Sequence, residues 1–390
     1  MKFKRNEDCK YDEKQKIVFV SCFDAYDNRI KHIESMLKER GYESIYITSN
    51  FNHIKKEFYK IDRENTIQIN TLQYKKNFSI KRLLSHFLFS KKAIKQVEMI
   101  KPDILYVMLP PNSLAYFSSK HKKKYQSKLI FDIYDLWPET FPSKKFKTIL
   151  SVPFAIWMQL RNKNLKHADV VVTECNLFRE RILSFIGEAK TVTLYPLKIT
   201  EINRNNNIQA VNTELNICYL GSINNIIDID SISDLLGKVN KSRSITVHII
   251  GDGEKRERLI ESLEAKKINV LFYGPVYDDI KKQEIFDKCV LGINMMKDTV
   301  CIGMTLKSID YMNGGLPLLN NIKGDTHEMV KEYGFGINVD QDLNLTAQII
   351  ANLDDKKVED LRKQTQEIYH KKFSRESFNN NVNEIFDESF

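Results

Sequence analysis

No apolar run in this 390-residue sequence is long enough to cross a bilayer. The best candidate, residues 148–160, contains Pro153 and Gln159 and falls short of the roughly 20 residues that a membrane span needs. The N-terminal stretch MKFKRNEDCKYDEKQK lacks the apolar core of a secretory signal. We therefore expect a cytoplasmic protein, with a peripheral position at the inner membrane face left open.

Metal-binding and disulfide patterns are also missing. The six cysteines include no CxxC pair, and the eight histidines form no HxH or HExxH motif. A zinc site needs ligands clustered at short spacings, and a disulfide framework needs an oxidising compartment. We expect buried, reduced thiols, no metal and no bound cofactor.

Glycine is scarce in the first half of the chain. Only Gly41 and Gly187 precede residue 200, and the other twelve of the 14 glycines follow it. Close approach of the backbone to a phosphate usually requires glycine, because a Cβ atom would block it. A nucleotide is therefore expected in the C-terminal half.

Acidic residues are absent from residues 71–97, a segment that holds seven basic residues. Aromatic and aliphatic residues alternate with them at a spacing that fits an amphipathic helix. Such a helix can lie on an anionic membrane surface, or it can be a core helix with a solvated basic face. No nucleic-acid-binding motif accompanies the net charge of +9, so nucleic acid is not an expected partner.

Short β-branched runs alternate with helical patterns along the whole chain, which predicts an α/β fold with parallel sheets. The expected strands are 17–21, 45–48, 67–70, 104–109, 129–133 and 170–173, and then 215–220, 245–250, 270–273, 290–294, 316–320 and 336–339. We expect two Rossmann-like doubly wound domains, 1–200 and 201–373, joined by a polar linker at 200–214, and a C-terminal helix at 374–390 that packs on either domain. Ligands of such sheets bind beyond the carboxyl ends of the strands, which places the site in the cleft between the domains.

Four segments of the second half carry candidate binding residues. ICYLGSI and VHIIGDGEKRERL place Gly221–Ser222 and Gly251-Asp252-Gly253 after strands, where backbone N–H groups can face a diphosphate. NVLFYGPV places a Gly-Pro turn at the end of another strand. In GMTLKSIDYMNGGLP, helical spacing puts Lys307, Asp310 and Tyr311 on one side of a helix, although an i,i+3 surface ion pair would show the same spacing.

These segments, in this order, resemble the donor domain of the GT-B glycosyltransferases, in particular family 4. The first half agrees with the resemblance through VSCFDAYDNRIKHIESMLKERGYESIYIT, KPDILYVMLPP, FDIYDLWPE and HADVVVTE. It covers about residues 16–390, and its most specific parts are DLWPE and KSIDYMNGGLP. It implies a GT-B fold of two facing domains.

The resemblance also implies roles for single residues. Asp310 takes the place of the ribose-binding carboxylate, Lys307 that of a phosphate contact, and Asp135 lies near the reaction centre, so Asp135 and Lys307 are the expected catalytic residues. The donor-binding residues would be Gly221, Ser222, Gly251, Gly253, Tyr273, Gly274, Val276, Thr305, Lys307, Asp310 and Tyr311. The acceptor-side residues would be Asp27, Arg29, His53 and Asp135.

Two positions depart from the family pattern. Ile302 stands where the family has an acidic sugar contact, and SINNIIDID has no basic residue where relatives carry Arg and Lys. The donor phosphates are then expected to rely on Lys307, on backbone amides and on Arg29 of the opposite domain.

The implied activity is transfer of a sugar from a nucleoside diphosphate sugar, a UDP-sugar before a GDP-sugar, to a saccharide acceptor in polysaccharide or glycoconjugate synthesis. Retention of configuration, metal independence and a lipid-linked acceptor are expected with it. A sugar-nucleotide epimerase and a non-catalytic partner of another transferase remain alternatives. A nicotinamide-dependent oxidoreductase is disfavoured, because no glycine-rich fingerprint follows the first strand.

Overall fold

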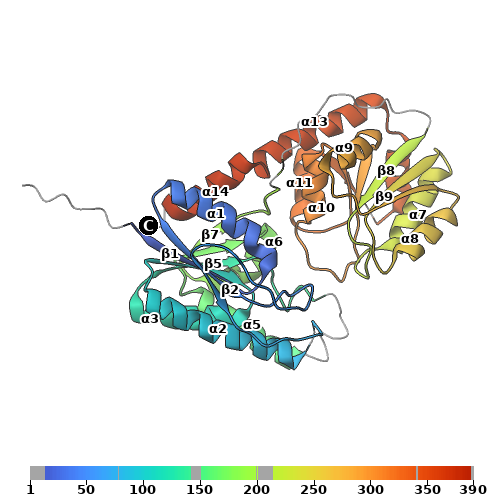
Figure 1. The fold of residues 1–390 in the computed structure, drawn as a ribbon. Helices are drawn as coiled ribbons and strands as arrows, with labels where there is room; N and C mark the ends of the chain where they lie inside the picture. Colours follow the sequence, from blue (N-terminus) through green and yellow to red (C-terminus); the bar gives the residue numbers. More distant parts are fainter. Residues whose placement is uncertain are drawn as a thin grey trace, which may run out of the picture.

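A computed structural model describes residues 14–77, 79–141, 151–198, 200, 214–339 and 341–387. They form two α/β domains, one from each half of the chain, and each consists of a sheet covered by helices (Figure 1). Of the expected linker at 200–214, residues 201–213 lie outside the described residues.

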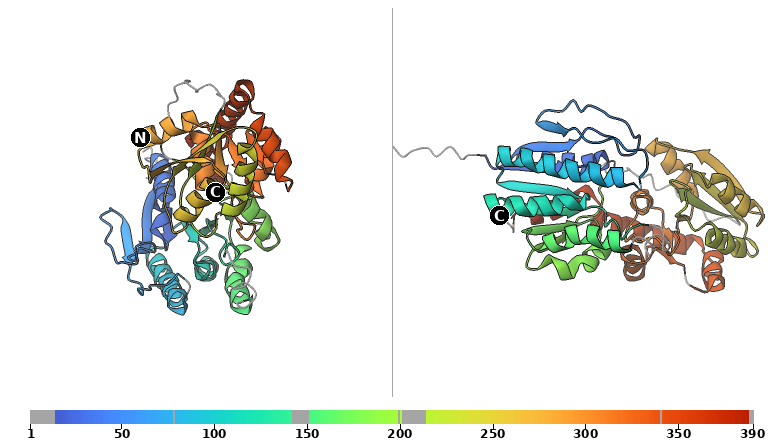
Figure 2. Two further views of the ribbon diagram at one scale, coloured as in Figure 1. Left: turned by 90° about the vertical axis from the view of Figure 1, so that its right-hand side faces the viewer. Right: turned by 90° about the horizontal axis from the view of Figure 1, so that it is seen from below.

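The N-terminal domain has a seven-stranded parallel sheet in the order β3-β2-β1-β4-β5-β6-β7. Its strands are β1 (Lys16–Ser21), β2 (Glu43–Ser49), β3 (Thr66–Ile69), β4 (Ile104–Leu109), β5 (Lys128–Ile133), β6 (Val170–Thr173) and β7 (Lys190–Thr193). Its helices are η1 (Asp24–Tyr26), α1 (Asp27–Glu39), α2 (Ile80–Ile100), α3 (Asn112–Tyr125), α5 (Ser151–Leu165) and α6 (Asn176–Ile186). Helices α2, α3 and α5 lie side by side on one face of the sheet (Figures 1 and 2).

The C-terminal domain has a six-stranded parallel sheet in the order β10-β9-β8-β11-β12-β13. Its strands are β8 (Leu215–Leu220), β9 (Ile245–Ile250), β10 (Asn269–Gly274), β11 (Leu291–Asn294), β12 (Leu318–Asn320) and β13 (Gly336–Asn338). Its helices are α7 (Ile229–Asn240), α8 (Arg256–Glu264), α9 (Asp279–Lys288), α10 (Leu306–Asn313), α11 (Asp325–Tyr333), α12 (Leu343–Ala351) and α13 (Asp355–Lys372).

The central strands are buried on both faces, as expected for parallel sheets with helices on each side. Every residue of β4, β6 and β9 is buried. The predicted strands and the α/β fold are confirmed within one or two residues at their ends, whereas β7 was missed because KTVT is short and only Val192 is buried.

The last helix, α14 (Arg375–Asp387), leaves the C-terminal domain and packs on the N-terminal one (Figure 1). Its Asn379 side chain is 2.8 Å from His32 Nε2, and Lys190 Nζ donates to the Glu384 carbonyl at 2.9 Å. Phe378, Val382 and Phe386 are buried in the core of the N-terminal domain. The crossing helix therefore ties the two domains together from the far end of the chain.

Candidate functional site

A pocket of about 470 Å³ lies between the two domains, where loops from the carboxyl ends of both sheets meet. The N-terminal domain contributes Glu139, after β5, and Leu177 and Arg181 of α6, after β6. The C-terminal domain contributes Asp228, before α7, and two loops, 296–302 after β11 and 321–323 after β12.

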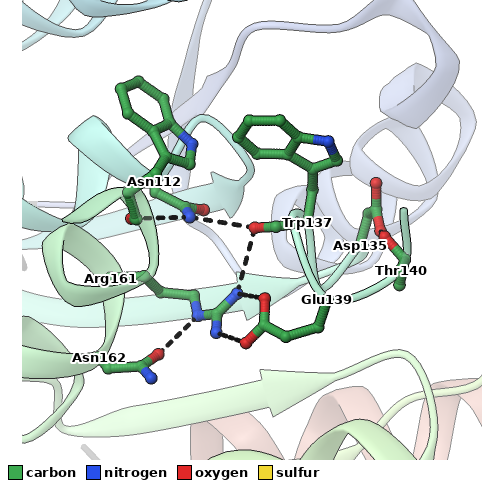
Figure 3. A network of polar contacts seen from close by, with 8 residues as sticks. Asn112, Asp135, Trp137, Glu139, Thr140, Arg161 and Asn162 are labelled. Carbon is green, nitrogen blue, oxygen red and sulfur yellow. Dashed lines mark hydrogen bonds and ion pairs between the residues drawn. The ribbon is translucent and has the colours of Figure 1, made fainter. Parts of the chain in front are cut away.

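On the N-terminal side, a buried polar network fixes the loop that contains DLWPE (Figure 3). Asn112 Nδ2 donates to the Trp137 carbonyl at 3.0 Å. The guanidinium of Arg161, which has no exposed surface, donates to both carboxylate oxygens of Glu139 and to the Trp137 carbonyl, and its Nε donates to Asn162 Oδ1. These hydrogen bonds hold the loop in place, and Glu139 of this loop lines the interdomain pocket.

Asp135, an expected catalytic residue, lies in this loop. Its Oδ1 accepts a hydrogen bond from the Thr140 hydroxyl at 2.7 Å. Burial raises the pKa of Asp135, while the Thr140 hydrogen bond and the charges of Arg82 and Arg161 act in the opposite direction. The carboxyl group is therefore desolvated and held in one orientation, as a reacting or positioning group requires.

Glu174, which the sequence analysis did not select, directly follows β6, the neighbour of β5 in the sheet. Burial raises the pKa of its carboxyl to about 8, the charge of Arg29 opposes this shift, and Asp135, Asp132 and Asp325 add to it. An acidic residue immediately after a buried strand was the available signal, since HADVVVTE ends in this glutamate.

The structure corrects the expectation for Arg29. Its guanidinium is buried inside the N-terminal domain, with Nε 2.7 Å and Nη2 3.0 Å from the two carboxylate oxygens of Asp132. Nη1 donates to the Leu194 carbonyl at 2.8 Å. Arg29 therefore closes an internal ion pair and is not available to donor phosphates.

Asp27 and His53, the other expected acceptor-side residues, are bound within the N-terminal domain. Asp27 accepts a hydrogen bond from the Tyr46 hydroxyl. His53 Nδ1 is 2.6 Å from the Tyr74 hydroxyl oxygen, and burial lowers the pKa of this imidazole to about 3. His53 is consequently neutral at physiological pH, and an acceptor role for both residues stays a prediction.

On the C-terminal side, glycines shape the loops after β8, β9 and β10. Gly221 has φ +112° and faces open space, and the exposed Ser222 follows it. Gly251 and Gly253 are required for close packing of the backbone. A Cβ on Gly251 would lie 2.0 Å from the Gly221 carbonyl oxygen, and a Cβ on Gly253 would lie 2.3 Å from the Ile223 carbonyl oxygen. Gly251 N–H in turn donates to the Gly274 carbonyl at 2.8 Å. These two glycines let neighbouring loops pack. At Gly221 the space beside the Cα is open, while its N–H donates to the Ile250 carbonyl at 2.8 Å.

Tyr273 and Val276 flank the Gly274 turn at the edge of this sheet. The Tyr273 hydroxyl is 2.9 Å from His248 Nδ1, and the two rings stack with centroids 5.8 Å apart. Tyr273 remains 41% exposed, and Val276 is half-buried. An exposed aromatic ring here is suited to a nucleobase, a role that stays a prediction.

Lys307 extends from the first turn of α10 over the ring of Tyr219, with Nζ 4.9 Å from the ring centroid. No described residue forms a hydrogen bond or ion pair with its ammonium group. Burial lowers the pKa of Lys307 to about 8. A desolvated ammonium without a carboxylate partner is prepared to bind an anion.

Two other expected donor-binding residues, Tyr311 and Thr305, have structural roles. Tyr311 is fully buried, and its hydroxyl accepts from Leu220 N–H at 2.6 Å beneath the end of β8. Thr305 Oγ1 caps α10 by accepting from Ser308 N–H, and it donates to Asn294 Oδ1. Helical spacing was right for Lys307 and Tyr311, but it did not show that this side of the helix packs against β8.

Asp310 pairs with two other lysines and not with Lys307. Its Oδ1 is 2.8 Å from Lys198 Nζ and 3.8 Å from Lys282 Nζ. A ribose would have to compete with these partners for the carboxylate, so the ribose role of Asp310 stays a prediction. No group of metal-ligating side chains occurs within the described residues.

Asp325, at the start of α11, joins the two domains directly. Its carboxylate accepts from Asn176 N–H at 2.7 Å and Leu177 N–H at 2.8 Å, the first N–H groups of α6. The Tyr195 hydroxyl donates to it at 2.6 Å. A carboxylate at a helix N-terminus is favourable both as a cap and in the field of the helix dipole. The C-terminal domain thus caps a helix of the N-terminal domain.

Comparisons with known proteins agree with this architecture. Residues 214–355 match the family model described as Glycosyl transferases group 1. No curated protein sequence matches the chain.

Solved structures align along almost the whole length. HepE of Anabaena, solved with UDP and glucose, has a TM-score of 0.63 at 14% identity, over 96% of this chain and 99% of its own. The galactosyltransferase WaaB of the lipopolysaccharide outer core has a TM-score of 0.64 at 14% identity, over 96% and 100%. Sucrose-phosphate synthase of Thermosynechococcus elongatus has a TM-score of 0.66 at 13% identity, over 96% and 99%. The expected two-domain fold is thereby confirmed.

Proposed function

We propose that the chain transfers a sugar from a UDP-sugar to a lipid-linked saccharide in surface polysaccharide or glycoconjugate synthesis. Residues 214–355 match the model of the group 1 glycosyltransferases, and the two-domain fold is that of the GT-B structures, which supports the proposal. The observation that carries this proposal is the interdomain pocket, which is lined by loops from the carboxyl ends of both sheets. Ligands of doubly wound sheets bind at such ends. One pocket can therefore bring a donor held by one domain to an acceptor held by the other.

In this proposal the donor would lie beyond the carboxyl end of β8. Gly221 leaves room for close approach of its diphosphate because no side chain fills the space beside the Cα. Lys307 offers the ammonium group, and Tyr273 offers a surface for the base. UDP is the proposed nucleotide, supported by HepE, whose structures contain UDP and UDP-glucose.

Catalysis in this scheme comes from stabilising the departing diphosphate. As the glycosidic bond breaks, negative charge grows on the phosphate oxygen, and the Lys307 ammonium opposes it in a desolvated setting. Asp135, fixed by Thr140, is proposed to orient the acceptor hydroxyl. We propose that the acceptor oxygen bonds to the anomeric carbon on the face from which the diphosphate leaves, while the hydroxyl proton passes to the departing phosphate oxygen. The anomeric configuration is then retained, and no metal takes part.

Incubation of the purified chain with UDP- and GDP-sugars, with and without saccharide acceptors, tests the proposal. Transfer from a UDP-sugar with retained configuration, measured by NMR, is the expected result. An epimerised sugar formed from donor alone would favour the epimerase alternative. Neither turnover nor hydrolysis of any donor would favour a non-catalytic partner.

The acceptor is proposed to be reached at an anionic membrane surface. On the outer helix layer, Ile80, Leu84 and Phe87 form a stripe along α2, with Ile80 85% exposed. Val152 and Ile156 are 67% and 62% exposed on α5 of the same layer (Figure 2). Exposed lysines at 81, 91, 92 and 95 flank the stripe on α2. Apolar side chains beside lysines suit the boundary between acyl chains and anionic headgroups. None of the described helices is long and apolar enough to span the bilayer.

Vesicle flotation tests the membrane surface. The chain should float with vesicles containing anionic lipid, and the double variant Ile80→Glu/Leu84→Glu should stay in the soluble fraction. Ile280→Glu, which changes an exposed isoleucine of the C-terminal domain, is the matched control and should float normally. Equal flotation of all three proteins would contradict a role for α2.

A further inference from the structure

Three basic side chains reach the interdomain pocket from three separate segments. Lys297 follows β11, Lys323 follows β12, and Arg181 lies on α6 of the opposite domain. Their side chains form no hydrogen bond or ion pair with a described residue. In contrast, two of the carboxylates that line the pocket are already bound, Glu139 by Arg161 and Asp228 by Ser231 N–H. The exposed Asp298 is the third acidic residue of the lining.

The two lysines stand on loops that are joined to each other. Asn321 Oδ1 accepts from Met296 N–H at 2.7 Å, and Asn321 Nδ2 donates to the Met296 carbonyl at 3.0 Å. Directly beneath, Asn294 and Asn320, the last residues of β11 and β12, are buried and linked by a 2.9 Å hydrogen bond. This amide network fixes the backbone that carries Lys297 and Lys323, so their positions are built into the fold.

Arg181 is placed by the contact between the domains. Leu177 and Arg181 are four residues apart, hence one helical turn, and both line the pocket. Leu177 N–H is one of the two backbone groups of α6 that donate to Asp325. Asp325 of the C-terminal domain therefore fixes the first turn of α6, and Arg181 lies on the next turn.

We infer that Arg181, Lys297 and Lys323 form an anion site divided between the two domains, which binds the diphosphate group of a substrate. The inference rests on the proposed function and names the side chains that would supply positive charge to the diphosphate. The loop after β8 and the start of α7, from Ser222 to Asp230, contain no basic residue, and Arg29 is enclosed in its own domain. Charge from the β11 and β12 loops and from α6 takes their place. The diphosphate belongs either to the nucleotide donor or to a lipid-linked acceptor.

Calorimetry on the full chain distinguishes a diphosphate of the nucleotide donor from one of a lipid-linked acceptor. Inorganic pyrophosphate, UDP and farnesyl diphosphate are titrated into the wild type and into Arg181→Gln, Lys297→Gln and Lys323→Gln. Each variant should bind a diphosphate ligand roughly tenfold more weakly, since a charge-assisted hydrogen bond is lost. Lys331→Gln, on the exposed surface of α11 outside the pocket, should bind like the wild type. Losses seen with UDP assign the site to the donor, and losses confined to farnesyl diphosphate assign it to the acceptor.

A double-mutant cycle tests the divided construction. Asp325→Asn should couple with Arg181→Gln, because both act through the position of α6, and it should add independently to Lys297→Gln. If all three pocket variants bind every diphosphate with unchanged affinity, the anion site is overturned. The proposed function is then tested by donor turnover alone. Pyrophosphate binding that depends on these residues supports the site even if no sugar is transferred.

Discussion

Lys307 is a single residue whose charge depends on pH close to neutrality. Burial lowers its pKa to about 8, so the side chain is mostly an ammonium at pH 7 and mostly a neutral amine at pH 9. An anionic ligand binds the protonated form. The affinity of the free protein for UDP should therefore fall about tenfold between pH 7 and pH 9.

Calorimetry with UDP at these two pH values measures the effect. Lys307→Met should bind more weakly at pH 7 and should lose the pH dependence, because its side chain does not titrate. A wild-type affinity that is constant between pH 7 and pH 9 would show that Lys307 does not contact the diphosphate.

Glu174 is a second residue whose environment predicts a pH effect, in this case on stability. Its carboxyl keeps its proton up to about pH 8 in the folded chain, while an unfolded glutamate releases it near 4.3. Between these values the folded state binds more protons, so this group lowers the free energy of unfolding as pH rises. Glu174→Gln should flatten the decline of the melting temperature between pH 5 and pH 8, as measured by calorimetry. Glu180→Gln, exposed on α6, should leave the decline unchanged.

Candidate residues could be selected where a motif marks them. Lys307 was selected because it begins the run KSIDYMNGGLP, and its donor role stays a prediction. The burial of Tyr311 depends on contacts with β8, about 90 residues earlier. Arg181, Lys297 and Lys323 belong to no motif, and only the folded chain brings them to one pocket. The sequence also gave no sign that Arg29 would be enclosed by Asp132.

At the scale of elements, strands were predictable because buried parallel strands are continuous apolar runs. β4 and β9 match the prediction at both ends, since ILYVML and ITVHII are buried throughout. The loop after β5 was recognised from DLWPE, but its support was not. That support comes from Arg161 on α5 and Asn112 on α3.

Removing one residue of the network that supports the DLWPE loop should lower the free energy of unfolding. Arg161→Met leaves the Glu139 carboxylate without its buried partner, and we expect a loss of roughly 3 kcal/mol in the free energy of unfolding, measured by urea titration. The double variant Arg161→Met/Glu139→Met should recover part of the loss, because both charges of the ion pair are then removed together. Equal losses in the single and double variants would show that packing of the long side chain, and not the ion pair, holds the loop.

At the scale of the whole molecule, each domain was predictable and their arrangement was not. Strand–helix alternation specifies two doubly wound sheets, but the orientation of one against the other depends on few contacts far apart in sequence. The α14 helix supplies one set of these contacts. A second set is the Asp325 carboxylate with Asn176, Leu177 and Tyr195, which are 130 to 149 residues away. The ion pair between Lys198 and Asp310 is a third contact.

Asp325 should therefore control how the domains are held together. Asp325→Ala removes the three hydrogen bonds that this carboxylate accepts from the N-terminal domain and uncaps α6, so the domains should be held less closely by the contacts that remain, among them those of α14 and of Lys198 with Asp310. Small-angle X-ray scattering should show a larger radius of gyration than for the wild type. Tyr195→Phe removes only one of the three bonds and should give a smaller increase. Identical scattering from Asp325→Ala and the wild type would mean that the other contacts set the domain arrangement, and that Arg181 reaches the pocket without help from Asp325.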